Sequence, residues 1–81
     1  MQLNVLLFAG AKEAAGSDHV TIHTHGEPTA SEVLKALEQQ HPALSDLLPS
    51  CRLAVGNNYV DSDHTVTAND ELALIPPVSG G

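Results

Sequence analysis

The segment TASEVLKALEQQH, residues 29–41, has the pattern of an amphipathic helix. Thr29 and Glu32 are spaced so that each side chain can accept a hydrogen bond from the other's backbone N–H, the reciprocal arrangement called a capping box. The apolar residues recur at positions i, i+3, i+4 and i+7 and form one stripe: Ala30, Val33, Leu34 and Leu37. Pro42 forbids continuation past His41, because proline has no backbone N–H to donate. The pattern predicts one helix that packs one face against a core.

Two strands are expected before this helix. Residues 2–8 and 19–24 alternate in hydropathy, so that one set of side chains in each segment faces inward and the other outward. Residues 10–18 connect the two segments and can hold one helical turn. The two strands then form a hairpin with a long connection.

The alternation in hydropathy returns after the helix. Further strands are expected at residues 51–55, 59–60 and 71–75. Residues 56–58 form a turn between the first two of these strands, because Gly and Asn tolerate positive φ. Leucines within residues 44–48 suggest one more helical turn, which Pro49 ends.

The order of these elements is strand-strand-helix-strand-strand, with the short strand added between the last two. One helix on one face of a mixed sheet is the simplest two-layer arrangement that buries the apolar stripe. This order matches the β-grasp, or ubiquitin-like, fold of the α+β class, in which the first and last strands lie parallel at the centre of the sheet. We expect one β-grasp domain over residues 1–75, followed by an extended tail over residues 76–81.

The charge balance bears on the kind of partner. The chain has 81 residues and a mass of 8.5 kDa, which suits one domain with a small core. Ten acidic residues outnumber three basic ones, so the formal net charge is −7. Affinity for nucleic acid and for anionic membranes depends on Lys and Arg, so this surface should repel both. We expect a protein partner with a basic face instead.

Cys51 is the only cysteine of the chain. The sequence therefore has no internal disulfide and no zinc site built from several cysteines, which points to a reducing compartment. The apolar start of the chain is too short to span a bilayer, and no basic residue precedes it as in a signal peptide. We expect a cytoplasmic protein in which Cys51 alternates with Leu53 and Val55 as a small buried residue.

Few residues suggest catalysis or metal binding. His23 and His25 are two residues apart on a strand and could reach one metal ion, but no third ligand stands at a fixed spacing from them. Asp61, Asp63 and His64 form an acidic loop that lacks the glycine and the closing glutamate of a calcium site. We expect solvated surface at both places, with no metal and no directly bound cofactor.

The outward face of the sheet carries the first functional candidate. If the helix covers one face, the alternation sends these residues to the other: Leu6, Phe8, Ala54, Ala73 and Ile75. Because the first and last strands are adjacent, Leu6, Phe8 and Ile75 can form one exposed apolar patch, joined by Tyr59. Such a patch usually marks a protein interface, unless a loop or the short strand covers it. Acidic residues around it would steer a basic partner toward it.

The tail Pro76-Pro77-Val78-Ser79-Gly80-Gly81 carries the second candidate. The two prolines favour an extended path away from the sheet, and Val78 offers one apolar anchor. Gly80 and Gly81 have no Cβ, so the backbone can enter a narrow channel. Six residues of about 3.3 Å each can project the terminal carboxylate roughly 20 Å into another protein's active site. Adenylation would activate that carboxylate, and a sulfur donor could convert it to a thiocarboxylate.

With these features the chain resembles the small subunit of molybdopterin synthase over essentially all of its length. The ending is the specific part of the resemblance. The other matching pieces are Phe8-Ala9, Lys12-Glu13-x-x-Gly16, Ala54-Val55 before a turn, and Asp70-Glu71. The sequence departs from the family's usual residues at three positions, which are compatible with the fold: Lys12 in place of Arg, Gly56 in place of Asn, and Asn69 in place of Gly.

The resemblance implies a β-grasp sulfur carrier that acts through Gly81. An enzyme of the ubiquitin-activating type would adenylate the C-terminal glycine, and a sulfur donor protein would convert it to the thiocarboxylate. The carrier would dock on the large synthase subunit, insert its tail, and give sulfur to a cyclic pyranopterin phosphate to build the dithiolene of molybdopterin. Two sulfurs are needed per product, so two small and two large subunits would form a heterotetramer. The residues that bind pterin should belong to the large subunit.

Three other functions stay open on the residues alone. The carrier could serve thiamine, cysteine or another sulfur pathway. It could instead be a protein modifier joined to lysines through Gly81, since the same activated terminus serves both chemistries. It could also be an interaction domain with an inert tail, which deletion of Gly81 would reveal.

Overall fold

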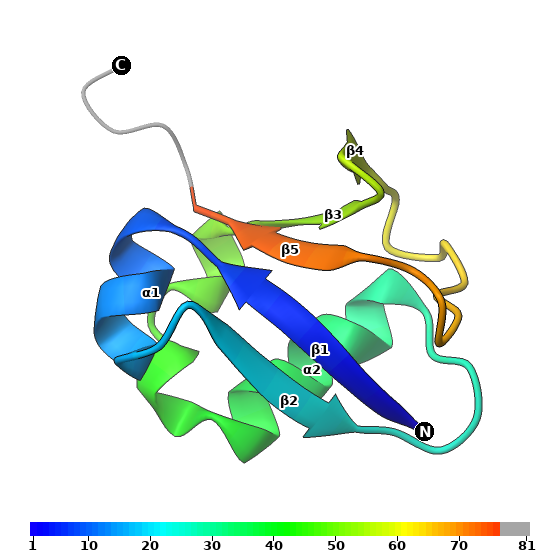
Figure 1. Ribbon diagram of the computed structural model, residues 1–81, viewed down its shortest axis with the longest axis horizontal. Helices are drawn as coiled ribbons and strands as arrows, with labels where there is room; N and C mark the ends of the chain where they lie inside the picture. The colour runs from blue at the N-terminus through cyan, green and yellow to red at the C-terminus, as the bar shows by residue number, and fades with distance from the viewer. Residues whose placement is uncertain (77–81) are drawn as a thin grey trace.

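The computed structural model describes residues 1–76 of the chain, so the predicted tail residues Pro77, Val78, Ser79, Gly80 and Gly81 lie outside the described part (Figure 1). The elements are β1 (Gln2–Leu7), α1 (Ala9–Ala15), β2 (His19–His23), α2 (Ala30–Gln40), η1 (Pro42–Leu44), η2 (Leu48–Ser50), β3 (Arg52–Val55), β4 (Asn58–Tyr59) and β5 (Leu72–Ile75). The labels η1 and η2 denote 3₁₀ helices.

The five strands form one mixed sheet in the order β2-β1-β5-β3-β4. β1 pairs parallel with β5 at the centre, and the other neighbouring pairs are antiparallel. α2 crosses one face of the sheet, behind the strands in the view of Figure 1. This arrangement confirms the predicted β-grasp fold with one main helix on one face.

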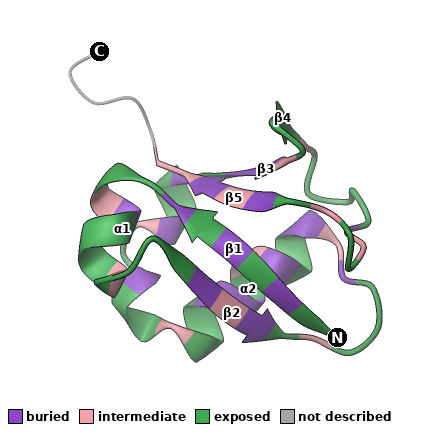
Figure 2. Ribbon diagram, in the orientation of Figure 1, coloured by how far each residue is buried: buried purple, intermediate pink, exposed green. Residues whose placement is uncertain are grey.

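The core lies between α2 and the sheet. Burial alternates along β1, where Leu3, Val5 and Leu7 are buried and the residues between them are exposed (Figure 2). Val33 and Leu37 of α2 have no exposed surface and pack in the same cluster. The inward faces predicted from the alternation are therefore correct. Aliphatic side chains and Cys51 make up this core, and the two aromatic residues of the chain are exposed.

The predicted capping box begins α2. The Thr29 hydroxyl accepts a hydrogen bond from the Glu32 N–H at 3.2 Å, and the Glu32 carboxylate accepts one from the Thr29 N–H at 2.9 Å. The N–H groups of Ala30 and Ser31 donate to the carbonyls of His64 (2.8 Å) and Ser62 (2.9 Å). The first turn of α2 is thus satisfied both by its own residues and by the loop before β5.

The other end of α2 covers the free edge of β2. The Gln40 side-chain amide accepts from the His23 N–H at 2.9 Å and donates to the His23 carbonyl at 2.8 Å, as a neighbouring strand would. Nε2 of His41 lies 2.8 Å from the Thr21 carbonyl. An edge strand with free N–H and C=O groups can pair with another chain, and these contacts occupy part of that edge.

Three local features differ from the sequence expectation. The connection after β1 forms α1, which is longer than the single turn expected. The helix ends at Gly16, whose φ of 72° suits a residue without Cβ and whose N–H donates to the Lys12 carbonyl at 2.9 Å. The helical turn expected over residues 44–48 is replaced by the two 3₁₀ helices η1 and η2. Pro49 lies inside η2 instead of ending a turn, because the first positions of a helix do not use the proline N–H.

The hairpin between β3 and β4 has a two-residue turn. Gly56 and Asn57 have φ values of 57° and 70°, and the flanking pairs are Val55 with Asn58 and Ala54 with Tyr59. Positive φ at both central residues matches the right-handed twist of the strands. β4 therefore begins one residue earlier than expected, which places Tyr59 directly opposite Ala54.

Candidate functional site

The face of the sheet turned away from α2 carries the predicted patch residues. The strand pairings join Leu6 to Ala73, Ala73 to Ala54, and Ala54 to Tyr59, so one row of side chains runs from β1 to β4. Phe8 follows β1, and Ile75 ends β5 in the next position along the parallel register. The residues of the patch therefore come from three separate segments of the chain: the end of β1, β4 and β5.

Three of the four patch residues are well exposed. The exposed fractions are 37% for Leu6, 47% for Phe8 and 55% for Tyr59, while Ile75 is half-buried. We call Leu6, Phe8, Tyr59 and Ile75 the sheet patch. Large apolar side chains gathered on one face are typical of a protein interface. That the sheet patch binds a partner stays a prediction.

Ala54 differs from its expected exposure. It points away from the core cluster, as the alternation predicts, but only 6% of its surface is exposed. Its cross-strand neighbours are Tyr59 and Ala73, and the larger Tyr59 ring stands beside its small side chain. Ala54 therefore lies buried between its cross-strand neighbours on this face and is not an exposed part of the sheet patch.

A hollow of about 360 Å³ lies at the end of β1, where the sheet meets α1. It is lined by Leu6, Leu7, Phe8, Ala9, Lys12 and Asp18. The His19 ring lies 2.9 Å from the Asp18 carboxylate, and this hydrogen bond, with the charges of His19 and Lys12, holds the pKa of Asp18 below its ordinary value of 3.8. An apolar floor next to an ionised carboxylate and an ammonium group can receive a partner side chain with an apolar body and a polar end.

Ala9 shapes the entrance to this hollow. Its φ of 48° lies in the left-handed region, which a residue with Cβ seldom adopts. The chain turns here from β1 into α1, and the Phe8 carbonyl accepts from the Ala11 N–H at 3.1 Å. The turn leaves the Phe8 side chain at the surface beside the hollow.

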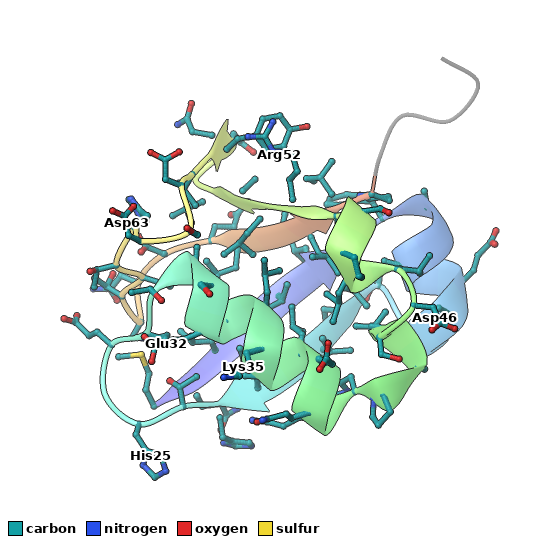
Figure 3. All side chains as sticks on the ribbon, turned by 180° about the vertical axis from the view of Figure 1, so that it is seen from behind. His25, Glu32, Lys35, Asp46, Arg52 and Asp63 are labelled. Carbon is teal, nitrogen blue, oxygen red and sulfur yellow. The ribbon has the colours of Figure 1, made fainter. Side chains whose placement is uncertain are left out.

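No sequence pattern marks Arg52 as a site residue. The Arg52 guanidinium lies over the Tyr59 ring, 4.4 Å from its centre, at the β4 side of the sheet patch (Figure 3). The length of the β3–β4 turn would have indicated this contact. A two-residue turn puts Tyr59 opposite Ala54, and therefore diagonally across from Arg52 on the same face of the sheet. Long side chains can span the distance between diagonal neighbours. The turn length had to be known before that neighbour could be identified.

The tail leaves the sheet beside the patch. β5 ends at Ile75, which pairs with Arg52 across the antiparallel ladder, and Pro76 follows half-buried. The predicted site residues from Pro77 to Gly81 lie outside the described residues. The root of the tail is thus flanked by Arg52 on one side and by the Phe8 end of β1 on the other.

The histidine and acidic candidates do not form a site in the described part of the chain. Within residues 1–76, no three His, Cys, Asp or Glu side chains are close enough to hold a metal ion. His25 lies beyond β2, which ends at His23, so the two side chains do not share a strand. Asp61 accepts at its backbone carbonyl from the His64 N–H at 3.0 Å, in an exposed turn.

Cys51 is buried, as predicted, with 8% of its surface exposed and its side chain in the core cluster. Burial raises the pKa of the thiol above its ordinary value of 9.0. A thiol held in its neutral form is a poor nucleophile. Among the helices of residues 1–76, none has the length and apolar character needed to cross a membrane.

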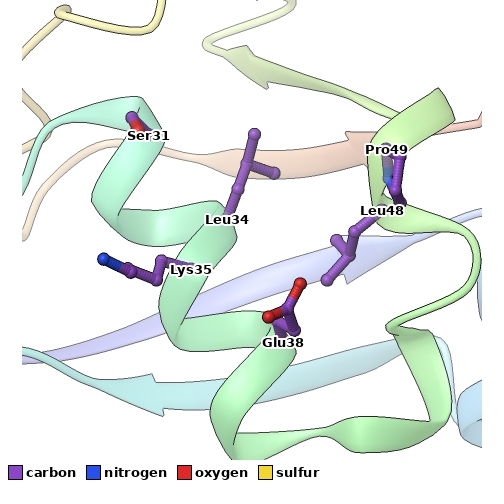
Figure 4. A pocket seen from close by; sticks show the side chains of 6 residues that line it. All are labelled: Ser31, Leu34, Lys35, Glu38, Leu48 and Pro49. Carbon is purple, nitrogen blue, oxygen red and sulfur yellow. The ribbon is translucent and has the colours of Figure 1, made fainter.

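A second groove lies on the far side of α2. Leu34 on the helix and Leu48 on η2 form its sides, and Lys35 and Glu38 project from the same helix (Figure 4). A lysine and a glutamate three residues apart on a helix are an ordinary solvated pair. The groove brings together no group that could act on a substrate.

The comparisons with known proteins agree with this fold. The model of the ThiS family matches residues 5–81. The chain is 40% identical to the molybdopterin synthase sulfur carrier subunit of Dictyostelium discoideum, with 99% of this chain and 96% of that protein covered. It is 36% identical to small archaeal modifier protein 1 of Haloferax volcanii, with 93% and 95% covered. The solved structure of SAMP1 from Haloferax volcanii superposes with a TM-score of 0.84 at 34% identity, with both chains fully covered.

Proposed function

The chain belongs to the ThiS family, and on that premise we propose that it is a sulfur carrier for molybdopterin synthesis that acts through a thiocarboxylate at Gly81. The single observation that carries the proposal is its match, over nearly the full length of both chains, to a molybdopterin synthase sulfur carrier subunit. The β-grasp fold, with β5 leading directly into a tail that ends in Gly80-Gly81, supports it. The free carboxylate of Gly81 is the reacting group.

Activation of that carboxylate takes two steps. A carboxylate oxygen of Gly81 attacks the α-phosphorus of ATP and releases pyrophosphate, which gives an acyl-adenylate. Sulfur at the oxidation level of sulfide, supplied by the donor as hydrosulfide, then attacks the acyl carbon, and AMP leaves, so that a C–S bond replaces the C–O bond without a redox change. An adenylating enzyme of the ubiquitin-activating type and a sulfur donor protein carry out these steps. The resulting thiocarboxylate transfers its sulfur to a cyclic pyranopterin phosphate, and two transfers complete one dithiolene.

The carrier needs a partner with a pocket. The relative's name describes a subunit, so we propose that this chain assembles with another, larger subunit of the synthase. The sheet patch is the docking surface, since it lies beside the root of the tail. A docked carrier would direct residues 76–81 into the active site of that subunit, and two copies of each subunit would supply the two sulfurs. A free, buried Cys51 suits the reducing cytoplasm, where we place the protein.

A second candidate function is protein modification. The 36% identity to small archaeal modifier protein 1 favours it. The same acyl-adenylate at Gly81 could be attacked by a lysine amine of a target, which gives an isopeptide and releases AMP. The two functions share the activation step and differ only in the nucleophile.

Reconstitution with purified proteins tests the proposal. The thiocarboxylated protein is mixed with the other synthase subunit and cyclic pyranopterin phosphate, and the product is measured. We expect molybdopterin, and none from a variant that lacks Gly81. Thiocarboxylated protein that binds the other subunit but forms no molybdopterin would contradict the proposed pathway. Isopeptides to Gly81 in cell extract would then favour the modifier.

A further inference from the structure

Charged side chains are almost absent from the sheet. The formal net charge of the chain is −7, yet Arg52 is the only Lys, Arg, Asp or Glu within any of the five strands. Every carboxylate side chain of the described residues therefore lies on a helix or in a loop. Asp18 lies beside Leu6 and Phe8 of the sheet patch, whereas the one formal charge within the strands, on Arg52, is positive. That a basic partner is attracted to the patch stays a prediction.

Arg52 lies over the Tyr59 ring at the edge of the sheet patch. The guanidinium stacks on the Tyr59 ring at 4.4 Å, and the side chain is exposed. No carboxylate of residues 1–76 forms an ion pair with it. A guanidinium that stacks by its flat face keeps the N–H groups in its plane free to donate. These donors match the two oxygens of a carboxylate.

We propose that Arg52, stacked on Tyr59, binds a carboxylate side chain of the other synthase subunit when the sheet patch docks. This inference rests on the proposed function. The partner surface it predicts is apolar at its centre and carries an Asp or Glu at the rim that meets Arg52. Arg and Tyr are enriched at protein interfaces and among the residues that contribute most to binding.

Arg52 lies close to the point where the tail leaves the sheet. Arg52 pairs across the ladder with Ile75, one residue before Pro76. A carboxylate bound to Arg52 would therefore fix the partner next to the root of the tail. Arg52 is a positioning residue in this account, because it touches the partner and not the reacting carboxylate of Gly81.

Lys35 supplies a matched control. It is exposed on α2, which covers the opposite face of the sheet, and it lies apart from Arg52 in Figure 3. Arg52→Glu and Lys35→Glu change the net charge by the same amount. Any effect of net charge on association is therefore common to both variants.

The experiment measures the Kd between this protein and the purified other subunit by calorimetry, at low and high salt. We expect Arg52→Glu to raise Kd about tenfold or more and Lys35→Glu to raise it less than about threefold. Arg52→Lys keeps the charge without the paired donors, and should fall between the wild type and Arg52→Glu. Tyr59→Leu should weaken binding and Tyr59→Phe should not, because Phe retains the ring. Circular dichroism checks that each variant is folded.

The binding measurements distinguish the role of Arg52 from the proposed docking of the sheet patch on the other subunit. Equal effects of Arg52→Glu and Lys35→Glu, with tight binding of the wild type, would overturn the role of Arg52 and leave the proposed function standing. A wild-type protein that does not bind the other subunit at all would overturn the proposed docking itself, and this inference with it.

Discussion

Phe8 shows what a single exposed aromatic residue can mean. Nearly half of its surface, 47%, is exposed although it follows directly after a strand whose alternate residues are buried. It lines the hollow at the end of β1 with Lys12 and Asp18. A small domain with only two aromatic residues places both of them outside its core. Their function is therefore better sought in binding than in stability.

Phe8→Asp tests this interpretation. We expect the variant to fold with nearly unchanged thermal stability, because Phe8 lies outside the core cluster, and to bind the other synthase subunit at least about tenfold more weakly. Gln39→Asp, at an exposed position on α2, adds the same charge and should leave binding unchanged. An unfolded Phe8→Asp protein in circular dichroism would show that Phe8 is structural, and equal affinities of the two variants would remove it from the interface.

At the scale of the elements, the stability of the fold depends on how α2 packs on the sheet and on its N-terminal cap. Leu37 has no exposed surface and lies at the centre of the stripe that packs on the sheet. Leu37→Ala should cost about 2–5 kcal/mol in the free energy of unfolding, because the lost contacts leave a cavity. Leu34→Ala, on the half-buried side of the same helix, should cost clearly less. Denaturant titration compares the two, and a larger loss at Leu34 would mean that the helix packs on another side.

The capping box makes α2 sensitive to acid. Hydrogen bonds from the Thr29 N–H and hydroxyl hold the pKa of Glu32 below its ordinary value of 4.5. A carboxyl whose pKa is lower in the folded state adds stability above the unfolded value, and loses it as pH falls through the folded pKa. Stability should therefore decline from about pH 4.5 downward, partly through Glu32.

Glu32→Gln isolates this contribution, because the amide can accept the same hydrogen bonds without titrating. We expect its Tm to fall less than that of the wild type between pH 7 and pH 3. Glu38→Gln is the matched control on the same helix, since Glu38 makes no side-chain hydrogen bond within residues 1–76. The same acid-induced loss of Tm in Glu32→Gln and wild type would contradict the effect.

Sequence patterns predicted those features of the elements that depend on near neighbours. The capping box of α2 requires only Thr29 and Glu32, three residues apart, and the strand faces require only alternation. The contacts of Gln40 with His23 and of Arg52 with Tyr59 join residues that the fold alone brings together. They could not be predicted before the strand order and the length of the β3–β4 turn were known.

At the scale of the whole molecule, the two faces of the sheet differ in what they contact. One face and α2 form the core, while the other face presents the sheet patch, Arg52 and the root of the tail (Figures 2 and 3). The central parallel pair, β1 with β5, places the end of the last strand next to Phe8. The fold thus places the sheet patch beside Pro76, where the tail begins.

The central claim is that Gly81 carries sulfur, and the intact mass of the untagged protein from its native host tests it most directly. We predict a fraction heavier by about 16 Da, the replacement of one oxygen by sulfur, which fragmentation assigns to Gly81 and not to an oxidised Met1. The fraction should be absent from a variant that lacks Gly81. A mass that stays unmodified, even after incubation with the adenylating enzyme, ATP and a sulfur source, would contradict the account.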